Sequence, residues 1–443
     1  EGKQIGVKDT YFTLTFNRPA DRESVEKTLQ IEPPLPGKMS WAGHNLYYTL
    51  TELPLYGASY QVSLKGAKKF QGTNSVDRGS IEPFASAFKT RDRVLAYIGV
   101  EGQEKGRLIL YNLTRNQKNI LTAPDLVVTD FKIYPDGDKI LFSAYERDSQ
   151  GLAQQELYTI TTGLNFQASD DLQPAGKIQK ILDARDYENL KFDLSPDGQL
   201  TVIQRRNRQN PSEVDLWLLS PSANPQPLGI PANSFTITPD SQRVAVSQKQ
   251  GIAVLPLAKG AQSAQFFPLY DKILGFSQDG SKSLMEKYNA DYTRSLFLVS
   301  KEGREKELFR TLSPIAACEF EPRNEQIIYC IKTDVVETAG QYQEEQILAA
   351  IDLKTAQNFL LLTLPNYQEI DMSMSPDGLA LVFDQLVRDF SPSRDRLLTQ
   401  DGQAIAAARL WLLPLSYLQT GDKPITQLFP QALFPGLKPQ WLP

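Results

Sequence analysis

Apolar and polar residues alternate in short stretches along most of the chain, and turn-forming residues separate the stretches. Alternation over roughly four to eight residues is typical of a half-buried β-strand. From residue 130 onward, one such stretch recurs directly before a four-residue corner. The corners read YPDG at 134–137, SPDG at 195–198, TPDS at 238–241, SQDG at 277–280, EPRN at 321–324 and SPDG at 375–378.

The residues around each corner repeat as well. Large apolar residues stand two positions before the second corner residue, namely Ile133, Leu194, Ile237, Phe276, Phe320 and Met374. The positions two residues further back hold Phe131, Phe192, Phe235, Leu274, Cys318 and Met372. In the corner, Pro sets the first φ angle, Asp caps its own backbone and Gly accepts a positive φ. Two more apolar runs follow, so each unit is predicted to be a small antiparallel sheet.

Such sheets cannot bury their faces alone, and radial stacking solves both this problem and that of the exposed strand edges. Corners spaced by 39 to 61 residues therefore predict a β-propeller. The order of an aromatic residue, an apolar residue, S-P-D-G and a strand resembles the TolB-type, WD-repeat-like propeller blades of bacterial envelope proteins. The resemblance covers residues 93–443 and is most specific at the two SPDG corners.

The number of blades depends on how the ring closes. Residues 93–122 look like the last three strands of a blade whose first strand is missing. The segment from Pro439 to Pro443 places Trp441 where the apolar residue before a corner belongs. We therefore expect this C-terminal segment to supply the missing innermost strand, which gives seven blades. Six blades with irregular ends are the alternative, because the stretch from 376 to 443 is longer than a regular repeat.

Residues 1–91 lack the repeat and are expected to form a separate domain, with the propeller spanning 92–443. Strands are predicted at 10–16, 46–51, 58–64 and 84–90, with a helical patch around 22–29. The passage from Phe16-Asn17-Arg18-Pro19 through Trp41 to Leu55-Tyr56-Gly57 and Tyr60 resembles the Ig-like domain of bacterial surface-layer proteins. The resemblance implies a small β-sandwich that serves as a spacer or adhesive module, with Trp41 and Tyr60 in its core.

Composition narrows the possible functions. A net charge of −5 over 443 residues argues against general nucleic-acid binding, which needs a basic excess. No stretch of about 18 apolar residues is present to span a membrane. The chain begins with Glu1 rather than Met, so we expect a processed chain whose membrane contact comes only through an anchor outside it. With the envelope resemblance, this favours an extracytoplasmic location.

Motifs for catalysis are missing from the sequence. His44, the only histidine, lies in a Gly-His-Asn turn, and no Cys or His pair has zinc spacing. No nucleophile elbow, P-loop or dinucleotide fingerprint occurs. We therefore predict that the protein is not an enzyme and has no cofactor or metal. A glycosidase that uses two carboxylates is the least favoured hypothesis, because 52 acidic residues leave it open.

The two cysteines, Cys318 and Cys330, flank the EPRN corner within one predicted hairpin. They share a face of that hairpin but are offset by about one residue pair. Two buried thiols are the favoured interpretation, and a disulfide, which needs a small register shift, is the alternative.

The connections between the second and third strands of each blade should emerge on one face, where propellers often carry function. Five are long and charged, at 146–156, 204–213, 287–295, 332–346 and 384–409. Arginine and aromatic residues are favoured in interface hot spots. The predicted partner-binding residues are Arg205, Arg206, Arg208, Arg388, Phe390, Arg394 and Arg396.

These observations favour a non-catalytic scaffold that binds protein partners, as an accessory or assembly factor of a bacterial envelope or membrane complex. A carbohydrate- or cell-wall-binding module is the alternative. It requires an aromatic platform in the central funnel of the propeller.

Overall fold

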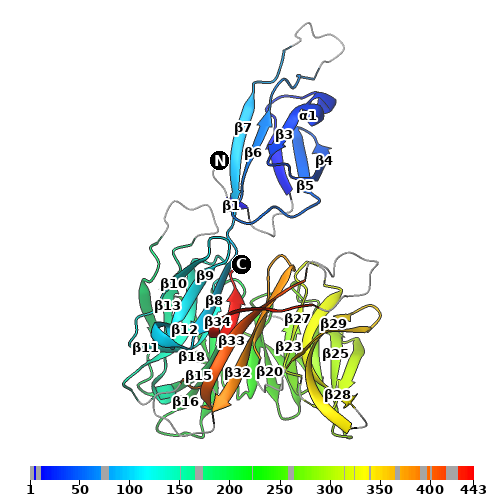
Figure 1. The fold of residues 1–443 in the computed structure, drawn as a ribbon. Helices are drawn as coiled ribbons and strands as arrows, with labels where there is room; N and C mark the ends of the chain where they lie inside the picture. Colours follow the sequence, from blue (N-terminus) through cyan, green and yellow to red (C-terminus); the bar gives the residue numbers. More distant parts are fainter. Residues whose placement is uncertain are drawn as a thin grey trace.

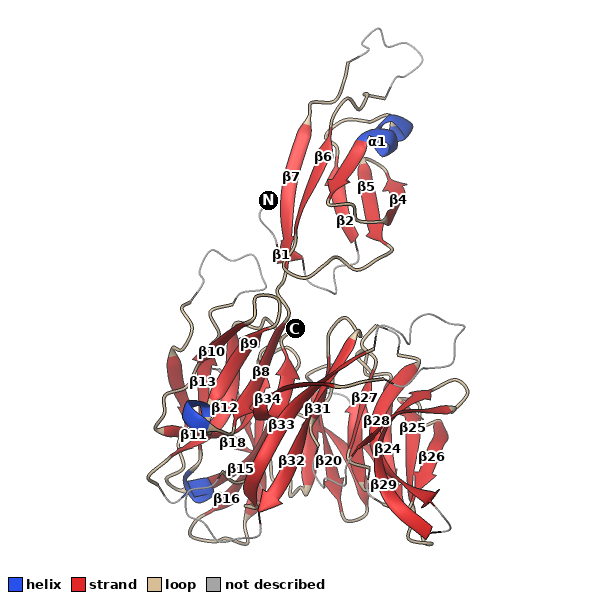
Figure 2. Cartoon of the chain, in the orientation of Figure 1, coloured by secondary structure: helices blue, strands red, loops and turns tan. Residues whose placement is uncertain are grey.

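The computed structural model describes residues 4–5, 11–70, 79–149, 151–164, 173–221, 223–257, 264–313, 315–323, 325–338, 341–364, 370–389, 397–399, 402–415 and 428–443. Strands dominate its regular structure (Figure 2). A small N-terminal domain stands on one side of a larger ring of sheets, and a short connection at 91–93 joins them (Figure 1).

The N-terminal domain is a two-layer sandwich. One sheet has the order β1 (Gln4–Ile5), β7 (Phe84–Thr90), β6 (Ser59–Leu64) and β3 (Leu29–Glu32). The other consists of β2 (Tyr11–Thr15), β5 (Asn45–Leu50) and β4 (Gly37–Ala42), and helix α1 (Arg22–Thr28) begins at the N-cap Asp21. Val25, Leu46 and Leu64 form the buried core between these layers. The four predicted strands and the helical patch are thus confirmed, with small shifts at their ends.

Five sheets of four antiparallel strands follow one another along the described part of the ring. The first two consist of β11 (Leu126–Ile133), β12 (Lys139–Glu146), β13 (Glu156–Thr161) and β14 (Ile178–Leu182), and of β15 (Tyr187–Leu194), β16 (Thr201–Asn207), β17 (Val214–Leu219) and β18 (Gln226–Pro227). The third consists of β19 (Ser234–Ile237), β20 (Arg243–Gln248), β21 (Gly251–Pro256) and β22 (Gln265–Pro268). The last two consist of β23 (Lys272–Phe276), β24 (Lys282–Tyr288), β25 (Arg294–Ser300) and β26 (Glu305–Thr311), and of β27 (Ala317–Phe320), β28 (Ile327–Thr338), β29 (Gln341–Asp352) and β30 (Asn358–Leu364).

A continuous sheet joins the two ends of the repeat region. Its order is β10 (Gln117–Ile120), β9 (Leu108–Asn112), β8 (Val94–Gly99), β34 (Gln431–Trp441), β33 (Ala404–Pro414), β32 (Ala380–Asp389) and β31 (Met372–Met374). The first half of β34 pairs with β33, and its second half pairs with β8, where Trp441 lies opposite Leu95. Two short 3-10 helices, η1 (Gly102–Glu104) and η2 (Gly151–Gln154), complete the described elements.

The corners have the local chemistry that the sequence predicts. In the SPDG corner at 195–198, Gly198 has a φ of 71° and its N–H donates to the Ser195 carbonyl at 2.8 Å. The Asp197 carboxylate accepts from the Gln199 N–H at 3.0 Å and from the Ser195 hydroxyl at 2.6 Å. These bonds hold Asp197 ionised and contribute to its lowered pKa, against the opposing effect of burial.

Each sheet packs on the next through apolar side chains, which makes the ring a β-propeller. Val202 and Leu216 of one sheet, for example, share a buried cluster with Val244 and Val246 of the following sheet. The strands β11, β15, β19, β23, β27 and β31 precede the corners and lie innermost. In β11, β15 and β27, apolar residues alternate with Lys132, Asp193 and Glu319, which reach across to the neighbouring sheet.

The N-terminal domain contacts the ring at the corner of the last repeat. The Arg93 guanidinium lies 4.5 Å from the Tyr56 ring centroid and forms an ion pair with the fully buried Asp377 carboxylate. The chain approaches closely at Gly57, where an added Cβ would lie 2.6 Å from a Thr114 side-chain atom. The domain therefore stands on the side of the ring that carries the corners.

Candidate functional site

The connections between the second and third strands of each sheet lie at the other end of those strands from the corners. They form the side of the ring that points away from the N-terminal domain, and we call this side the loop face (Figure 2). The predicted binding residues belong to this region of the chain, but the four that the structure describes all make contacts within the protein.

Arg205 is not a loop residue. It lies in β16, is only 6 % exposed, and its Nε donates to Asn189 Oδ1 at 3.1 Å. Its guanidinium lies 4.4 Å from the Tyr187 ring centroid and 4.9 Å from that of Trp217. Because a guanidinium can be buried by stacking on aromatic rings, this arginine fits inside a sheet. Arg205 is therefore a buried residue of β16, and its role in partner binding stays a prediction.

Arg206 and Arg208 are held by neighbouring backbone and acidic groups. Arg206 forms an ion pair with Glu188 at 3.2 Å. The Arg208 guanidinium donates to the Ala184 carbonyl at 2.8 Å and to the carbonyl of Ala153. These contacts tie adjacent loops together. Arg388 lies half-buried in β32 and also makes contacts within the chain. Phe390, Arg394 and Arg396 lie outside the described residues.

The predicted loop at 332–346 is mostly a ribbon of two strands. β28 and β29 pair continuously from Ile327 opposite Asp352 to Thr338 opposite Gln341. The outer half of this stretch is polar and charged, which is typical of a loop, but pairing between strands needs no apolar face. The ribbon extends the loop face beside the sheet β23–β26.

Exposed apolar side chains gather on the loop face of the sheet β23–β26. Leu269, Tyr288, Tyr292 and Leu312 are 68, 46, 77 and 59 % exposed, and we call these four residues the apolar row. The Tyr288 and Tyr292 rings lie 6.3 Å apart, and Leu269 and Leu312 lie in the connections that precede and follow the same sheet. The Tyr288 N–H donates to the Asp271 carboxylate at 2.6 Å, and the turn at Asp291 is tied to Arg310 by an ion pair at 3.1 Å.

A cavity of about 880 Å³ opens on the corner side of the ring, at the centre, and we call it the funnel. Equivalent polar residues of the innermost strands line it, and each reaches the next sheet. Asp193 accepts from the Ile237 N–H at 2.8 Å, and Glu319 accepts from the Met374 N–H at 2.8 Å. Lys132 forms an ion pair with Asp193 at 3.3 Å. The polar groups of the funnel therefore hold adjacent sheets together.

Glu319 is the funnel residue with the most perturbed acidity. Burial raises the pKa of its carboxyl to about 7, against the opposing effects of the Met374 N–H and the Lys132 ammonium. A carboxyl of this kind is partly protonated near neutral pH. Because one of its oxygens accepts the backbone N–H of the next sheet, its evident role is structural.

Asp384 lies where the closing strand meets the last sheet. It is 2 % exposed, and its two oxygens accept from the Lys438 N–H at 2.7 Å and from the Asp371 N–H at 2.8 Å. Burial and the Asp371 carboxylate raise the pKa of Asp384 to about 8. Lys438, at a φ of 52°, sends its ammonium to Asp130 at 3.3 Å and thereby joins the closing strand to β11.

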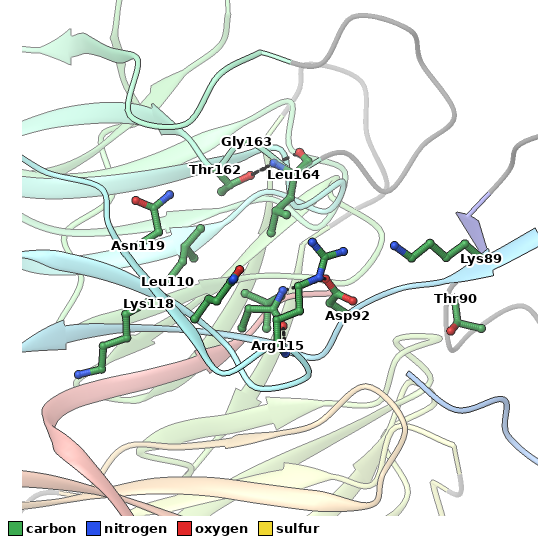
Figure 3. Close-up of a pocket in the computed structure, with 13 residues that line it drawn as sticks. Lys89, Thr90, Asp92, Leu110, Arg115, Lys118, Asn119, Thr162, Gly163 and Leu164 are labelled. Carbon is green, nitrogen blue, oxygen red and sulfur yellow. Dashed lines mark hydrogen bonds and ion pairs between the residues drawn. The ribbon is translucent and has the colours of Figure 1, made fainter. Parts of the chain in front are cut away.

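A pocket of about 610 Å³ lies between the end of β7 and the strands β8–β10 (Figure 3). Figure 3 shows Arg115 beside Asp92 in its middle, and the two form an ion pair at 2.7 Å. Lys118, which also lines it, pairs with Glu104 at 2.9 Å. Arg115 and Lys118 are therefore both engaged in ion pairs within the protein.

Cys318 and Cys330 form a disulfide. They lie directly opposite each other in the β27–β28 pair, with 4.2 Å between their Cα atoms. The favoured prediction of two thiols is therefore wrong, because the EPRN corner sets a register without the expected offset.

Within the described ranges, no group of three or more His, Cys, Asp or Glu residues is placed to hold a metal ion. None of the helices that the structure describes is long and apolar enough to cross a membrane.

The sequence matches no protein-family model, and comparison with curated proteins gave no match. The structure is similar to TolB from Acinetobacter baumannii, at 14 % identity and a TM-score of 0.40. That match covers 62 % of this chain and 65 % of TolB, which is less than two thirds of the TolB length. It is also similar to an oligogalacturonate lyase from Vibrio parahaemolyticus, at 11 % identity, 71 % and 90 % coverage and a TM-score of 0.47. A functionally unknown protein from Desulfotomaculum acetoxidans matches at 11 % identity, 78 % and 99 % coverage and a TM-score of 0.46.

At these TM-scores no function is transferred from the three proteins, and the propeller rests on the strand pairing described above. The apolar row was missed in the sequence because its residues come from two kinds of connection. Tyr288 and Tyr292 lie in a connection that the sequence singled out as charged, whereas Leu269 and Leu312 precede innermost strands. The presence of Tyr288 and Tyr292 close together in one short connection was the sequence feature that could have indicated an exposed apolar surface.

Proposed function

We propose that this protein is a non-catalytic scaffold that binds protein partners through its loop face, as an accessory or assembly factor of a bacterial envelope or membrane complex. The observation that carries the proposal is the apolar row. Exposed large apolar side chains that gather in one place mark an interaction surface, whereas isolated ones do not. Tyrosine in particular supplies contact area at a low cost in conformational entropy.

The proposed architecture is a seven-bladed propeller behind an N-terminal Ig-like domain. Its support for seven blades is the division of β34, whose halves pair with β33 and with β8. In this arrangement β34 completes the last blade and also provides the innermost strand of the first blade. Support for the Ig-like domain comes from two facing sheets of short strands.

The proposed location is outside the cytoplasm. The Cys318–Cys330 disulfide supports it, because disulfides persist in oxidising compartments and are rare in the cytosol. Mass spectrometry of the protein from its native source, alkylated without reduction, checks this point. Two alkylated thiols in the native protein would contradict the proposed location.

The funnel favours neither of the other two hypotheses. Its carboxylates at Asp193 and Glu319 are engaged in bonds between sheets, which is a structural use of the groups that a glycosidase would need. Trp441 is only 7 % exposed, and its Nε1 donates to the Ser373 carbonyl at 3.1 Å. It therefore offers little of the flat ring surface that sugar stacking requires.

The experiment is affinity capture of the full chain from native membranes after mild crosslinking, with identification by mass spectrometry. A double variant, Tyr292→Ser with Leu312→Ser, is compared with Leu360→Ser, a matched control that is also 59 % exposed but lies on the outer strand β30. We expect a reproducible protein partner that the double variant loses and the control keeps. Retention on cell-wall or glycan fractions, without a protein partner, would contradict the proposal.

A further inference from the structure

The ribbon formed by β28 and β29 stands beside the apolar row. β28 pairs with β27 only up to Ile331, and β29 pairs with β30 only from Gln346 onward. Beyond these residues the two strands pair only with each other in the described part of the chain. The ribbon therefore projects past its own sheet on the loop face.

One face of the ribbon is turned toward the apolar row. The Ser313 hydroxyl donates to the Glu344 carboxylate at 3.3 Å, which places the Glu344 side chain over the residue that follows Leu312. Val335 lies opposite Glu344 in the ladder, and Tyr342 lies two residues from Glu344. Side chains at such positions share one face of a sheet. Val335 and Tyr342, both exposed, therefore form a wall beside the floor that the apolar row provides.

Two residues of the floor have an unusual backbone. Leu269 and Tyr292 have φ angles of 70° and 65°, in the left-handed region that large side chains avoid. The other non-glycine residues with positive φ in the described chain are Asn116, Ser241, Ala356 and Lys438. Leu269 and Tyr292 are thus the large apolar members of this set, and both point into solvent. Strained residues of this kind gather at binding sites, where the strain fixes the presented side chain.

The charges around floor and wall are unequally compensated. Arg294 pairs with Glu286, and Arg310 pairs with Asp291. Arg310 also pairs with Glu307. Among the described residues, Asp271, Glu344 and Glu345 have no ion-pair partner, and on the cationic side the same holds for Lys272 and Lys287. The surface therefore presents apolar area with a surplus of negative charge along its edge. Complementary charge on a partner raises its association rate and its specificity.

We infer that the apolar row and the ribbon form a two-sided docking site for a protein segment with an apolar ridge and Lys or Arg residues beside it. The inference rests on the proposed scaffold function and names the chemistry of its partner. The ridge packs between Tyr292 on the floor and Tyr342 on the wall, and the basic residues face Glu344 and Asp271.

Site-specific photocrosslinking in cells tests the inference. A benzophenone amino acid replaces Tyr292 or Tyr342 in the full chain, and Leu360 on β30 is the control position. Crosslinked peptides are then sequenced. We expect both test positions to crosslink to the same partner segment, which is apolar with a net positive charge. Crosslinks to an acidic segment or to glycan overturn the inference, as does the absence of specific crosslinks at both positions.

A charge reversal provides a second readout. Glu344→Lys is compared with Glu302→Lys. Glu302 lies in the turn between β25 and β26, on the corner side of the ring. We expect Glu344→Lys to reduce the crosslinking yield at Tyr292 about five-fold at low salt and less at high salt, because salt screens exposed charges. Glu302→Lys should have no effect. Equal yields for the two variants overturn the charge assignment.

The two hypotheses fail in different ways. If the full chain still captures a protein partner while the floor and wall positions stay uncrosslinked, the scaffold function stands and its surface lies elsewhere. If no protein partner is captured at all, both the scaffold function and the docking site are wrong.

Discussion

The funnel and the loop face differ in how their side chains are used. Those of the funnel bond to the protein itself, whereas several on the loop face are exposed to solvent. In the funnel, Asp193 and Glu319 accept backbone N–H groups from the neighbouring sheet. Asp384, where the closing strand meets the last sheet, likewise accepts the N–H groups of Lys438 and Asp371. On the loop face, Tyr292 and Leu312 turn their side chains to solvent, and Glu344 forms no ion pair among the described residues. A charged cavity draws attention as a binding site, but here its polar groups are already bonded inside the protein.

The comparison shows that a structural polar cluster and a docking surface differ in whether their side chains are already engaged within the protein. Polarity and position alone do not distinguish them. Substitutions in the first region should cost folding stability, whereas those in the second should cost partner binding. The changes below test this division in order of their expected effect on the free energy of unfolding.

The largest effect is expected for Asp384→Ala. The change leaves the buried N–H groups of Lys438 and Asp371 without an acceptor, which should lower the free energy of unfolding by about 2–4 kcal/mol. Urea unfolding measures it. Asp371→Ala is the control, because this side chain is 59 % exposed and its pairing with Lys438 at 3.8 Å should contribute about 0.5 kcal/mol. Equal losses in the two variants would refute a special role of Asp384 in closing the ring.

Arg205→Ala tests whether the buried Arg205, like the polar residues of the funnel, contributes to folding stability rather than to partner binding. Loss of its stacking on Tyr187 and Trp217 and of its bond to Asn189 should cost about 2 kcal/mol. Partner capture by the folded variant should be unchanged. Arg185→Ala is the matched control, since its side chain is 84 % exposed on the neighbouring connection. If a folded Arg205→Ala variant no longer captured the partner, the predicted role of Arg205 in partner binding would be supported.

The pH dependence of stability tests the raised pKa of Glu319. Its folded pKa of about 7 lies above the ordinary value of 4.5, so the folded protein binds more protons between these values. The contribution is fully present below pH 4.5 and is lost as the pH rises through 7. Between pH 5 and 8, the melting temperature of the wild-type protein should therefore fall relative to that of Glu319→Gln. Parallel melting curves for the two proteins would mean that Glu319 titrates normally.

The smallest effect on stability, and of opposite sign, is expected for Tyr292→Gly. Glycine adopts a φ of 65° without steric cost, so the free energy of unfolding should rise by about 0.5–1 kcal/mol. Partner capture should nevertheless be lost, because the ring that makes the contact is gone. Thermal unfolding and capture are measured on the same sample. A destabilised variant would show that Tyr292 packs within the fold.

The fold was predictable because the corners repeat. The Pro, Asp and Gly residues at 196–198 specify one turn, and the apolar residues before them specify a strand, whatever the rest of the chain does. The same pattern led us to expect that the C-terminal segment adds a strand to the sheet of residues 93–122, and β34 does pair with β8. Local turn chemistry and alternation therefore contain most of the information on sheets and their order.

The candidate site was not predictable in the same way. Arg205 reads as a loop residue because its neighbours are charged, and only the positions of Tyr187 and Trp217 in space show that it is buried. Leu269 and Leu312 read as ordinary apolar residues before a strand. Their exposure depends on how neighbouring sheets meet, which a single sequence does not encode locally.

The shared strand β34 has a consequence for the order of events during synthesis. Leu95 is synthesised long before its pairing partner Trp441, and almost all of the ring lies between them in the sequence. Until then the inner edge of β8 remains unpaired, and an open edge can join another chain. Contacts so distant in sequence also slow folding. In this chain the ring closes only when β34 pairs with β8.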